Sequence, residues 1–260
     1  MACIKNTLMG AFVLALGAGA NAQSSTFDTP VSTGASQAAG VWYTDRYAPA
    51  GFTSPVNFMG DNRLKQTIAS ADGANNRPGA FSSAFYNTQG RKYDVNAGTN
   101  SISIDLFVAS DWASTGRRMA GLWGTGFDGA NAVSAYPILE FTSATDTDGS
   151  GGRFRSYDSN LGTWTNLGLP TGFGYDQFYT LNISLVGSNY VYTVGDKTSS
   201  YDSNGSAGIG NLMLQGYNNA AGVDYDIHWD NMNAVPEPAS MAAIGMGVLA
   251  LARRRKNKKA

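Results

Sequence analysis

The chain has 260 residues, of which 43% are apolar and 12% aromatic, enough to build a hydrophobic core and too many for a disordered protein. Residues 23–234 carry 11 Lys and Arg against 18 Asp and Glu, so no nucleic-acid partner is expected for this mildly acidic body. The only cysteine is Cys3, close to the N-terminus, which excludes disulfides, cysteine-based zinc sites and cysteine nucleophiles from the body.

The N-terminus has the pattern of a secretory signal peptide. Lys5 precedes an apolar run over residues 8–18 that is too short to span a membrane. Ala20 and Ala22 then form the small-x-small pattern that signal peptidases accept. We expect residues 1–22 to be removed on export. A buried N-terminal helix is the alternative, but the segment has no polar face to suit one.

The body between residues 23 and 234 shows the two-residue period of β-strands and no sustained helical period. The expected strands are 41–47, 63–69, 82–89, 101–108, 118–124, 136–143, 153–158, 211–217 and 224–234, with a hairpin over 178–194. Turns are expected at Asp72-Gly73, 75–79, Asp128-Gly129, Asp148-Gly149 and Asn204-Gly205. This all-β pattern predicts one domain, a single antiparallel β-sandwich.

Two stretches of the body resemble a known fold family. The hairpin "YTLNISLVGSNYVYTVGD" and the terminal strand "YDIHWDNM" are similar to segments of concanavalin A-like, laminin-G-type jelly rolls. The resemblance implies a jelly-roll sandwich. Because such folds carry both lectins and hydrolases, function has to be derived from a site.

Glu140 is the only glutamate of the body, in the strand "PILEFTS". Jelly-roll glycosidases use two carboxylates at a fixed separation, and Glu140 has no acidic residue two or five positions later. We therefore expect Glu140 to be a polar residue on the outward face of its strand rather than a catalytic acid.

Asp146 and Asp148, with Ser150, alternate within the glycine-rich stretch "SATDTDGSGGRF". Oxygen ligands at alternate positions in such a turn can bind calcium. No glutamate follows at the position that an EF-hand would need, so a polar hairpin turn is the alternative. Calcium is the only cofactor that the sequence suggests.

Aromatic residues near predicted turns are candidates for stacking on sugar rings, with nearby Asp and Asn to bind hydroxyls. The candidate glycan-binding residues are Trp123, Trp164, Tyr157, Asp128, Asp158 and Asn160. Core packing is the alternative for each aromatic taken singly.

His228 is the only histidine, and strand alternation places Asp226 and Asp230 on its face. These acids would raise its pKa. No Gly-x-Ser-x-Gly motif accompanies His228, so we expect a solvent-facing histidine rather than a member of a Ser-His-Asp triad.

The C-terminus combines a proline-bounded apolar segment with a basic tail. Pro236, Glu237 and Pro238 precede the apolar residues 239–252, which as a helix would be about 21 Å long, shorter than the roughly 30 Å of a hydrocarbon core. Arg253, Arg254 and Arg255 then end it and would keep the terminus cytoplasmic. A marginal helix after a helix-breaking motif indicates a segment that is held in the membrane only transiently.

The order Pro-Glu-Pro, short apolar segment and arginine cluster resembles the PEP-CTERM sorting signal of Gram-negative bacteria, over residues 235–260. The resemblance implies processing by an exosortase-type enzyme and delivery to the envelope, outer surface or extracellular matrix of a polysaccharide-producing host. A plain tail anchor is the alternative.

The sequence thus predicts an exported, non-catalytic surface or matrix protein that binds polysaccharide or has a structural role. The alternative is a glycan-active hydrolase or lyase that uses an Asp pair, which would require two carboxylates about 5–10 Å apart.

Overall fold

The computed structural model describes residues 21–236, except 74–75, 114–115, 145–150 and 219–223. Four short 3-10 helices lie at Ser70–Asp72, Gly79–Phe81, Ala84–Tyr86 and Ser110–Ala113. The strands are β1 (Gln23–Ser25), β2 (Thr33–Gly34), β3 (Trp42–Thr44), β4 (Gly51–Phe58), β5 (Asp61–Ile68), β6 (Thr88–Asp94), β7 (Thr99–Val108), β8 (Met119–Phe127), β9 (Val133–Ala135), β10 (Ile138–Thr142), β11 (Arg153–Asp158), β12 (Thr163–Gly168), β13 (Gln177–Val186), β14 (Asn189–Val194), β15 (Lys197–Asp202), β16 (Gly208–Tyr217) and β17 (Tyr225–Pro236).

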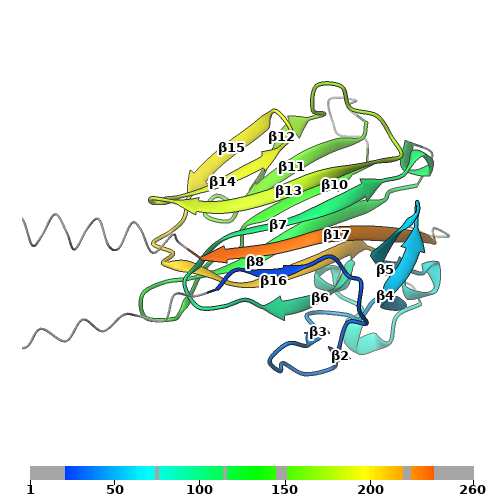
Figure 1. The fold of residues 1–260 in the computed structure, drawn as a ribbon, viewed down its shortest axis with the longest axis horizontal. Coiled ribbons are helices and arrows are strands. Elements are labelled where there is room, and N and C mark those ends of the chain that lie inside the picture. The colour runs from blue at the N-terminus through cyan, green and yellow to red at the C-terminus, as the bar shows by residue number, and fades with distance from the viewer. Residues whose placement is uncertain (1–20, 74–75, 114–115, 145–150, 219–223, 237–260) are drawn as a thin grey trace, which may run out of the picture.

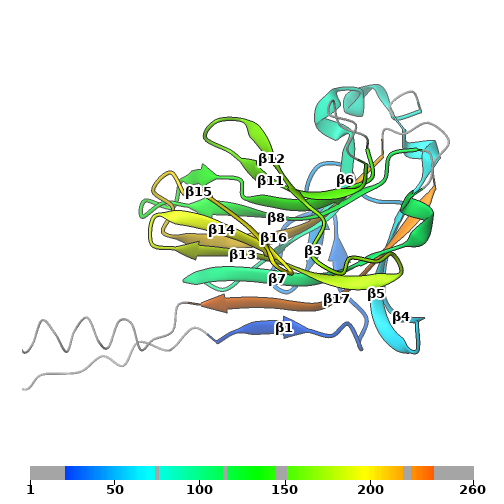
Figure 2. The same ribbon diagram turned by 90° about the horizontal axis from the view of Figure 1, so that it is seen from above.

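The strands form two sheets that pack face to face, as the expected all-β sandwich requires (Figures 1 and 2). The eight-stranded sheet has the order β15-β14-β13-β7-β17-β5-β4, with β1 paired to β17. The nine-stranded sheet has the order β12-β11-β10-β8-β16-β6-β3-β2, with β9 paired to β8. Neighbouring strands run antiparallel except for β2 and β3, which are parallel. The predicted single β-sandwich is confirmed.

Strand alternation builds the core between the two sheets. In β7, Ile102, Ile104 and Leu106 are fully buried, and in the paired β13, Leu181 and Ile183 meet them in register. Because side chains alternate along a strand, the residues between them, such as Ser101, Ser103 and Asp105, point away from the core. The predicted alternation of residues 101–108 therefore sets the inner face of this sheet.

One predicted strand is wrong over most of its length. Residues 82–89 were expected to be extended, but two 3-10 helices, Gly79–Phe81 and Ala84–Tyr86, occupy this region and β6 begins only at Thr88. The segment packs its rings locally, with Phe81, Phe85 and Tyr86 in edge-on contacts. In Figure 2 the segment of residues 76–87 stands above the nine-stranded sheet, on the side away from the eight-stranded sheet.

The two ends of the described chain lie side by side. Strand β1 begins at Gln23, directly after the predicted cleavage site, and pairs with β17 from Gln23↔Ala234 to Ser25↔Met232. Strand β17 continues to Pro236, which pairs with Thr99 of β7. The last strand of the sandwich thus includes the first proline of the predicted sorting motif. Figure 1 shows β1 in blue beside β17 in orange.

Within the described ranges, no helix is long and apolar enough to cross a membrane. The predicted sorting helix over residues 239–252 lies outside those ranges. So do Ala20, Glu237, Pro238 and the three terminal arginines.

Candidate functional site

The nine-stranded sheet has one face that points away from the core, here called the outer face. In β8, Ala120 and Leu122 belong to the main core, whereas Met119 and Trp123 belong to a separate apolar cluster with Ile138 and Met213. Because neighbours along a strand point to opposite sides, this second cluster lies on the outer face. Its members are buried, so the outer face is covered rather than flat and bare.

Two rows of side chains cross the outer face in register. The first row is mainly aromatic and apolar and consists of Trp164, Tyr157, Ile138, Trp123, Met213, Lys92 and Tyr43. The second row is mainly polar and consists of Asn166, Arg155, Glu140, Gly121, Gln215 and Gly90. An aromatic row beside a polar row is an arrangement that suits a sugar chain, which offers both apolar ring faces and hydroxyls.

Glu140 lies near the middle of the polar row and is only 1% exposed. Its Oε1 accepts hydrogen bonds from Arg155 Nε at 2.8 Å and from Arg155 Nη2 at 2.6 Å. Its Oε2 is buried and has no hydrogen-bond partner among the described residues. The sequence correctly places Glu140 on the outward face of β10, but the expectation of an ordinary solvated residue is wrong, since its neighbours cover it.

Burial raises the pKa of Glu140 above its ordinary value of 4.5, and the charge and hydrogen bonds of Arg155 oppose this effect. The Trp123 indole N–H also favours the charged carboxylate, although it makes no hydrogen bond of ordinary geometry. With both Arg155 hydrogen bonds on Oε1, a proton would sit on Oε2. The arrangement favours a protonated carboxyl group, buried at the centre of the outer face.

Several neighbours of Glu140 on the outer face are also buried with an unsatisfied polar atom. Within the described residues, the atoms without a hydrogen-bond partner on this face include Trp123 Nε1, Thr125 Oγ1, Asn211 Oδ1, Gln215 Oε1 and Arg117 Nε. Buried polar atoms in folded proteins nearly always have a partner, because leaving one unpaired costs about 1–3 kcal/mol. Other such atoms lie elsewhere in the described structure, among them Tyr190 Oη and Ser203 Oγ, but their number on this face makes it the candidate binding surface.

Three arginines stack on aromatic rings of the outer face. The guanidinium carbon of Arg155 is 4.0 Å from the ring centre of Trp164, and that of Arg117 is 4.0 Å from Tyr217. Arg46 lies 4.8 Å from Trp123 and 4.3 Å from Phe85, which belongs to the segment above the sheet. Each distance is within the range of a cation–π contact. Each stack covers one face of its ring with a positive charge.

Gly121 makes room for the centre of this site. A Cβ at this position would lie 2.7 Å from the Glu140 Cβ and 2.7 Å from Trp123 Nε1. We expect Gly121→Ala to lower the free energy of unfolding by about 1–3 kcal/mol, because the added methyl group displaces both neighbours. Urea denaturation measures the change. Gly129→Ala is the matched control, since its Cβ would meet nothing within 4 Å, and an equal loss in both variants would contradict this account.

A pocket of about 560 Å³ opens at one end of the rows. Its lining includes Tyr43 and Lys92 of the aromatic row together with Asp94, Asn211 and Phe127. The Tyr43 hydroxyl donates to Asp94 at 2.7 Å, which holds the ring in place. A pocket of this volume is in the range that accepts small ligands and sugar units.

The structure separates the six predicted glycan-binding residues into two groups. Trp123, Tyr157 and Trp164 share the aromatic row, and the Tyr157 and Trp164 rings lie 5.0 Å apart. Trp164 is 39% exposed. These three remain candidates for contact with a sugar chain.

The side chains of the three polar candidates form hydrogen bonds within turns and loops instead. Asp128 accepts from the backbone N–H groups of Ala130 and Ala132, and the buried Asp158 accepts from the N–H of Asn160. Asn160 donates to the carbonyl of Asp202. Their side chains are engaged in loop structure, and the idea that they bind glycan stays a prediction.

His228 does not match its predicted environment. Its ring stacks on Phe58 at 3.7 Å between ring centres, and Phe107 lies edge-on at 6.4 Å. Burial lowers its pKa, and the opposing effect of Asp226 is smaller. The expectation that neighbouring acids raise the pKa is therefore wrong, because Phe58 of strand β4 packs on the ring and leaves His228 half-buried.

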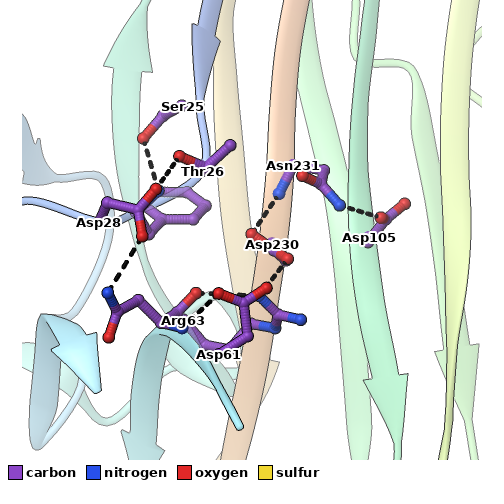
Figure 3. A network of polar contacts seen from close by, with 10 residues as sticks. Ser25, Thr26, Asp28, Asp61, Arg63, Asp105, Asp230 and Asn231 are labelled. Carbon is purple, nitrogen blue, oxygen red and sulfur yellow. Dashed lines mark hydrogen bonds and ion pairs between the residues drawn. The ribbon is translucent and has the colours of Figure 1, made fainter. Parts of the chain in front are cut away.

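An acidic pair lies on the other sheet, as Figure 3 shows. Arg63 Nη1 is 2.6 Å from Asp61 Oδ2 and 2.6 Å from Asp230 Oδ2, so the two carboxylates lie no more than about 5 Å apart. The hydrogen bond from Arg63 lowers the pKa of Asp61, and burial raises that of Asp230. Retaining glycosidases have a similar carboxylate spacing, but here the guanidinium fills the space between the acids. The network joins β5 to β17 and is structural.

The predicted calcium ligands Asp146 and Asp148 lie outside the described residues. Over the residues that are described, no group of three or more His, Cys, Asp or Glu side chains is placed to hold a metal ion.

Comparison with known families decides the nature of the C-terminal segment. The model of the PEP-CTERM protein-sorting motif matches residues 234–256. The chain ends in a PEP-CTERM sorting motif. This PEP-CTERM motif indicates export and envelope-associated sorting, with processing by an exosortase. No curated protein of similar sequence was found.

Solved structures share the fold of the body. The catalytic domain of an endo-1,3-beta-glucanase (laminarinase) from Thermotoga petrophila RKU-1 is 10% identical, with a TM-score of 0.53 over 84% of this PEP-CTERM chain and 100% of that chain. A non-specific endo-beta-1,3(4)-glucanase from family GH16 is 14% identical, with a TM-score of 0.50 over 82% of this chain and 89% of that chain. The predicted concanavalin A-like jelly roll is confirmed.

The same comparisons contradict the expectation of a non-catalytic protein. Both of these structures are endo-glucanases, and one of them is a catalytic domain. The expectation rested on the absence of an acidic residue two or five positions after Glu140, which tests only one arrangement of acids along one strand. This test does not detect an acid whose partners come from neighbouring strands.

Proposed function

We propose that this chain is an exported enzyme that hydrolyses polysaccharide on the outer face of its nine-stranded sheet, with Glu140 as the proton donor. The observation that carries the proposal is the state of Glu140, which is buried with a raised pKa and an unpartnered Oε2 among aromatic and polar residues. Both glucanases with this fold act on polysaccharides, which supports the choice of substrate class. The sorting motif supports action in the cell envelope or the extracellular matrix.

The chemical role of Glu140 follows from its contacts. A bound glycan would have to displace the side chains that cover Oε2. Protonated Oε2 would then donate its proton to the glycosidic oxygen as the bond to the anomeric carbon breaks. Water would supply the hydroxyl group of the new reducing end, and its second proton would restore the protonated Glu140. Arg155 holds Oε1 through two hydrogen bonds and so fixes the orientation of the carboxyl group. Trp123, Tyr157 and Trp164 would position the sugar rings along the aromatic row.

Asp45 brings a second carboxylate toward the polar row. It follows β3, and its Oδ2 accepts a hydrogen bond from Gln215 Nε2 of β16 at 3.4 Å. The carboxylate therefore reaches across β6, although four strand spacings separate the backbones of β3 and β10 by about 19 Å. We assign the proton-donor role to Glu140 on the basis of its own environment.

Glu140→Gln tests the assignment. The full-length protein is incubated with a panel of plant, bacterial and algal polysaccharides, and new reducing ends are measured. We expect the substitution to lower the rate at least about 100-fold, because the amide keeps the shape and loses the proton. The wild-type rate should fall as pH rises through the pKa of Glu140, since the ionised form cannot donate.

Asp226→Asn is the matched control, because it removes an acid from the opposite sheet, and its rate should be unchanged. Circular dichroism confirms that each variant is folded. Release of no reducing ends from any polysaccharide by folded wild-type protein would refute the proposal. An undiminished rate in folded Glu140→Gln would refute the role of Glu140.

A further inference from the structure

The outer face has an excess of positive charge within an acidic body. Its strands and the two residues on either side of each strand carry five acids, Asp45, Asp94, Asp128, Glu140 and Asp158. They also carry seven cations, Arg46, Arg91, Lys92, Arg117, Arg118, Arg153 and Arg155. Four of these cations lie in or beside the two rows, namely Arg46, Lys92, Arg117 and Arg155. By contrast, acids outnumber bases by 18 to 11 over residues 23–234. The cations are thus concentrated on the face that also holds the unpartnered polar atoms.

These cations change what the aromatic rings offer to a ligand. A neutral sugar ring stacks on an open aromatic face. Here guanidinium groups already cover one face of Trp164, Trp123 and Tyr217. A ligand on this surface therefore meets planar groups with several N–H donors, which match carboxylate and sulfate oxygens better than hydroxyls.

Arg117 is the cation most available to a ligand. It forms no ion pair within 4 Å among the residues that the structure describes, and its Nε is buried without a hydrogen-bond partner. Arg46 is more engaged, since its Nε lies 3.4 Å from Asp45 Oδ2 and its Nη1 donates to Thr88 Oγ1 at 3.2 Å. Arg117 therefore has the larger unused capacity for an anion.

The cations are spread over the sheet rather than gathered at one point. Arg155 is on β11 and Lys92 is on β6, and these strands are separated by β10, β8 and β16, a distance of about 19 Å between backbones. Arg117 precedes β8 and Arg46 follows β3. A spread of this kind suits a polymer with repeated charges rather than a single small anion.

We propose that the ligand of the outer face is an anionic polysaccharide, whose carboxylate or sulfate groups pair with these four cations. The inference rests on the proposed function only for the place where the glycan lies. It adds the substrate class, which neither the fold nor the sorting motif supplies.

Three polymers with one backbone test the charge requirement. Binding of the full-length protein to dextran, carboxymethyl-dextran and dextran sulfate is measured by affinity electrophoresis. We expect retardation by one or both charged polymers and none by dextran, and the charged arms distinguish carboxylate from sulfate. Affinity should fall at least tenfold between 50 and 500 mM NaCl, because salt screens exposed charges.

Arg117→Gln tests whether the charged polymer binds on the outer face. We expect about a tenfold loss of affinity, which corresponds to one charge-assisted contact. Lys65→Gln is the matched control, because it removes the same charge from the opposite sheet, and its affinity should stay within twofold. Equal losses in both variants would overturn the inference, since they would indicate non-specific attraction.

The two proposals fail separately. Equal binding of dextran and its charged forms would overturn the anionic ligand, and hydrolysis of a neutral polysaccharide would then leave the proposed function standing. Selective binding of a charged polymer that depends on Arg117, with no polysaccharide cleaved, would support the inference and refute the enzyme.

Discussion

Arg155→Ala is expected to lower the free energy of unfolding by about 3–5 kcal/mol at pH 7, because it leaves the Glu140 carboxylate buried without its partner. Arg155 makes both hydrogen bonds to Oε1 and also covers Trp164. Removal of the guanidinium therefore costs more than the pair contributes when intact. Urea denaturation at pH 7 measures the loss.

The pH dependence identifies the cause of this loss. Burial already raises the pKa of Glu140 in the folded protein, so stability linked to this group is fully present below about pH 4.5 and is lost as pH rises through the folded pKa. Without Arg155 the folded pKa rises further. The deficit of Arg155→Ala should therefore shrink as pH falls toward 4.5.

A double variant separates charge from packing. Arg155→Ala combined with Glu140→Gln should recover most of the stability at pH 7, because no buried charge remains. A deficit that is unchanged in the double variant and independent of pH would show that Arg155 acts only through its packing on Trp164.

The sequence predicted the central strands well and the edges poorly. Residues 101–108 alternate strongly and form most of β7, and residues 153–158 form β11 with the predicted bounds. Strands β4, β12 and β15 were missed, and each ends the order of its sheet or lies next to solvent on most of its length. A strand without a buried face needs no apolar alternation, so the pattern that reveals central strands is absent.

The candidate site was predictable only in part for a related reason. Trp123, Tyr157 and Trp164 were identified as aromatics near turns, and they do share one row. Arg117 and Gln215 carried no sequence signal, because strand register brings them to the same face from distant parts of the chain. Register depends on pairing between β8, β10 and β16, which a single sequence does not reveal.

The second large effect on stability is expected for substitution of Trp229, in the core. This residue of β17 is 0% exposed, and its Nε1 donates to Gln66 Oε1 at 3.1 Å. Gln66 in turn donates to the carbonyl of Gln89 at 2.9 Å, so the indole completes a buried polar chain between the two sheets. We expect Trp229→Ala to lower the free energy of unfolding by about 3–5 kcal/mol through the cavity that it leaves.

Trp229→Phe separates the two contributions at this position. Phenylalanine restores most of the ring volume but cannot donate, so Gln66 Oε1 would be buried and unpaired at a cost of about 1–3 kcal/mol. Adding Gln66→Leu to Trp229→Phe removes that unpaired atom, but it also leaves the Gln89 carbonyl without its hydrogen-bond donor. If Trp229→Phe were as stable as the wild type, the hydrogen bond would contribute nothing, and the role of Trp229 would be packing alone. A loss as large as that of Trp229→Ala would instead show that the polar chain between the sheets holds this part of the core together.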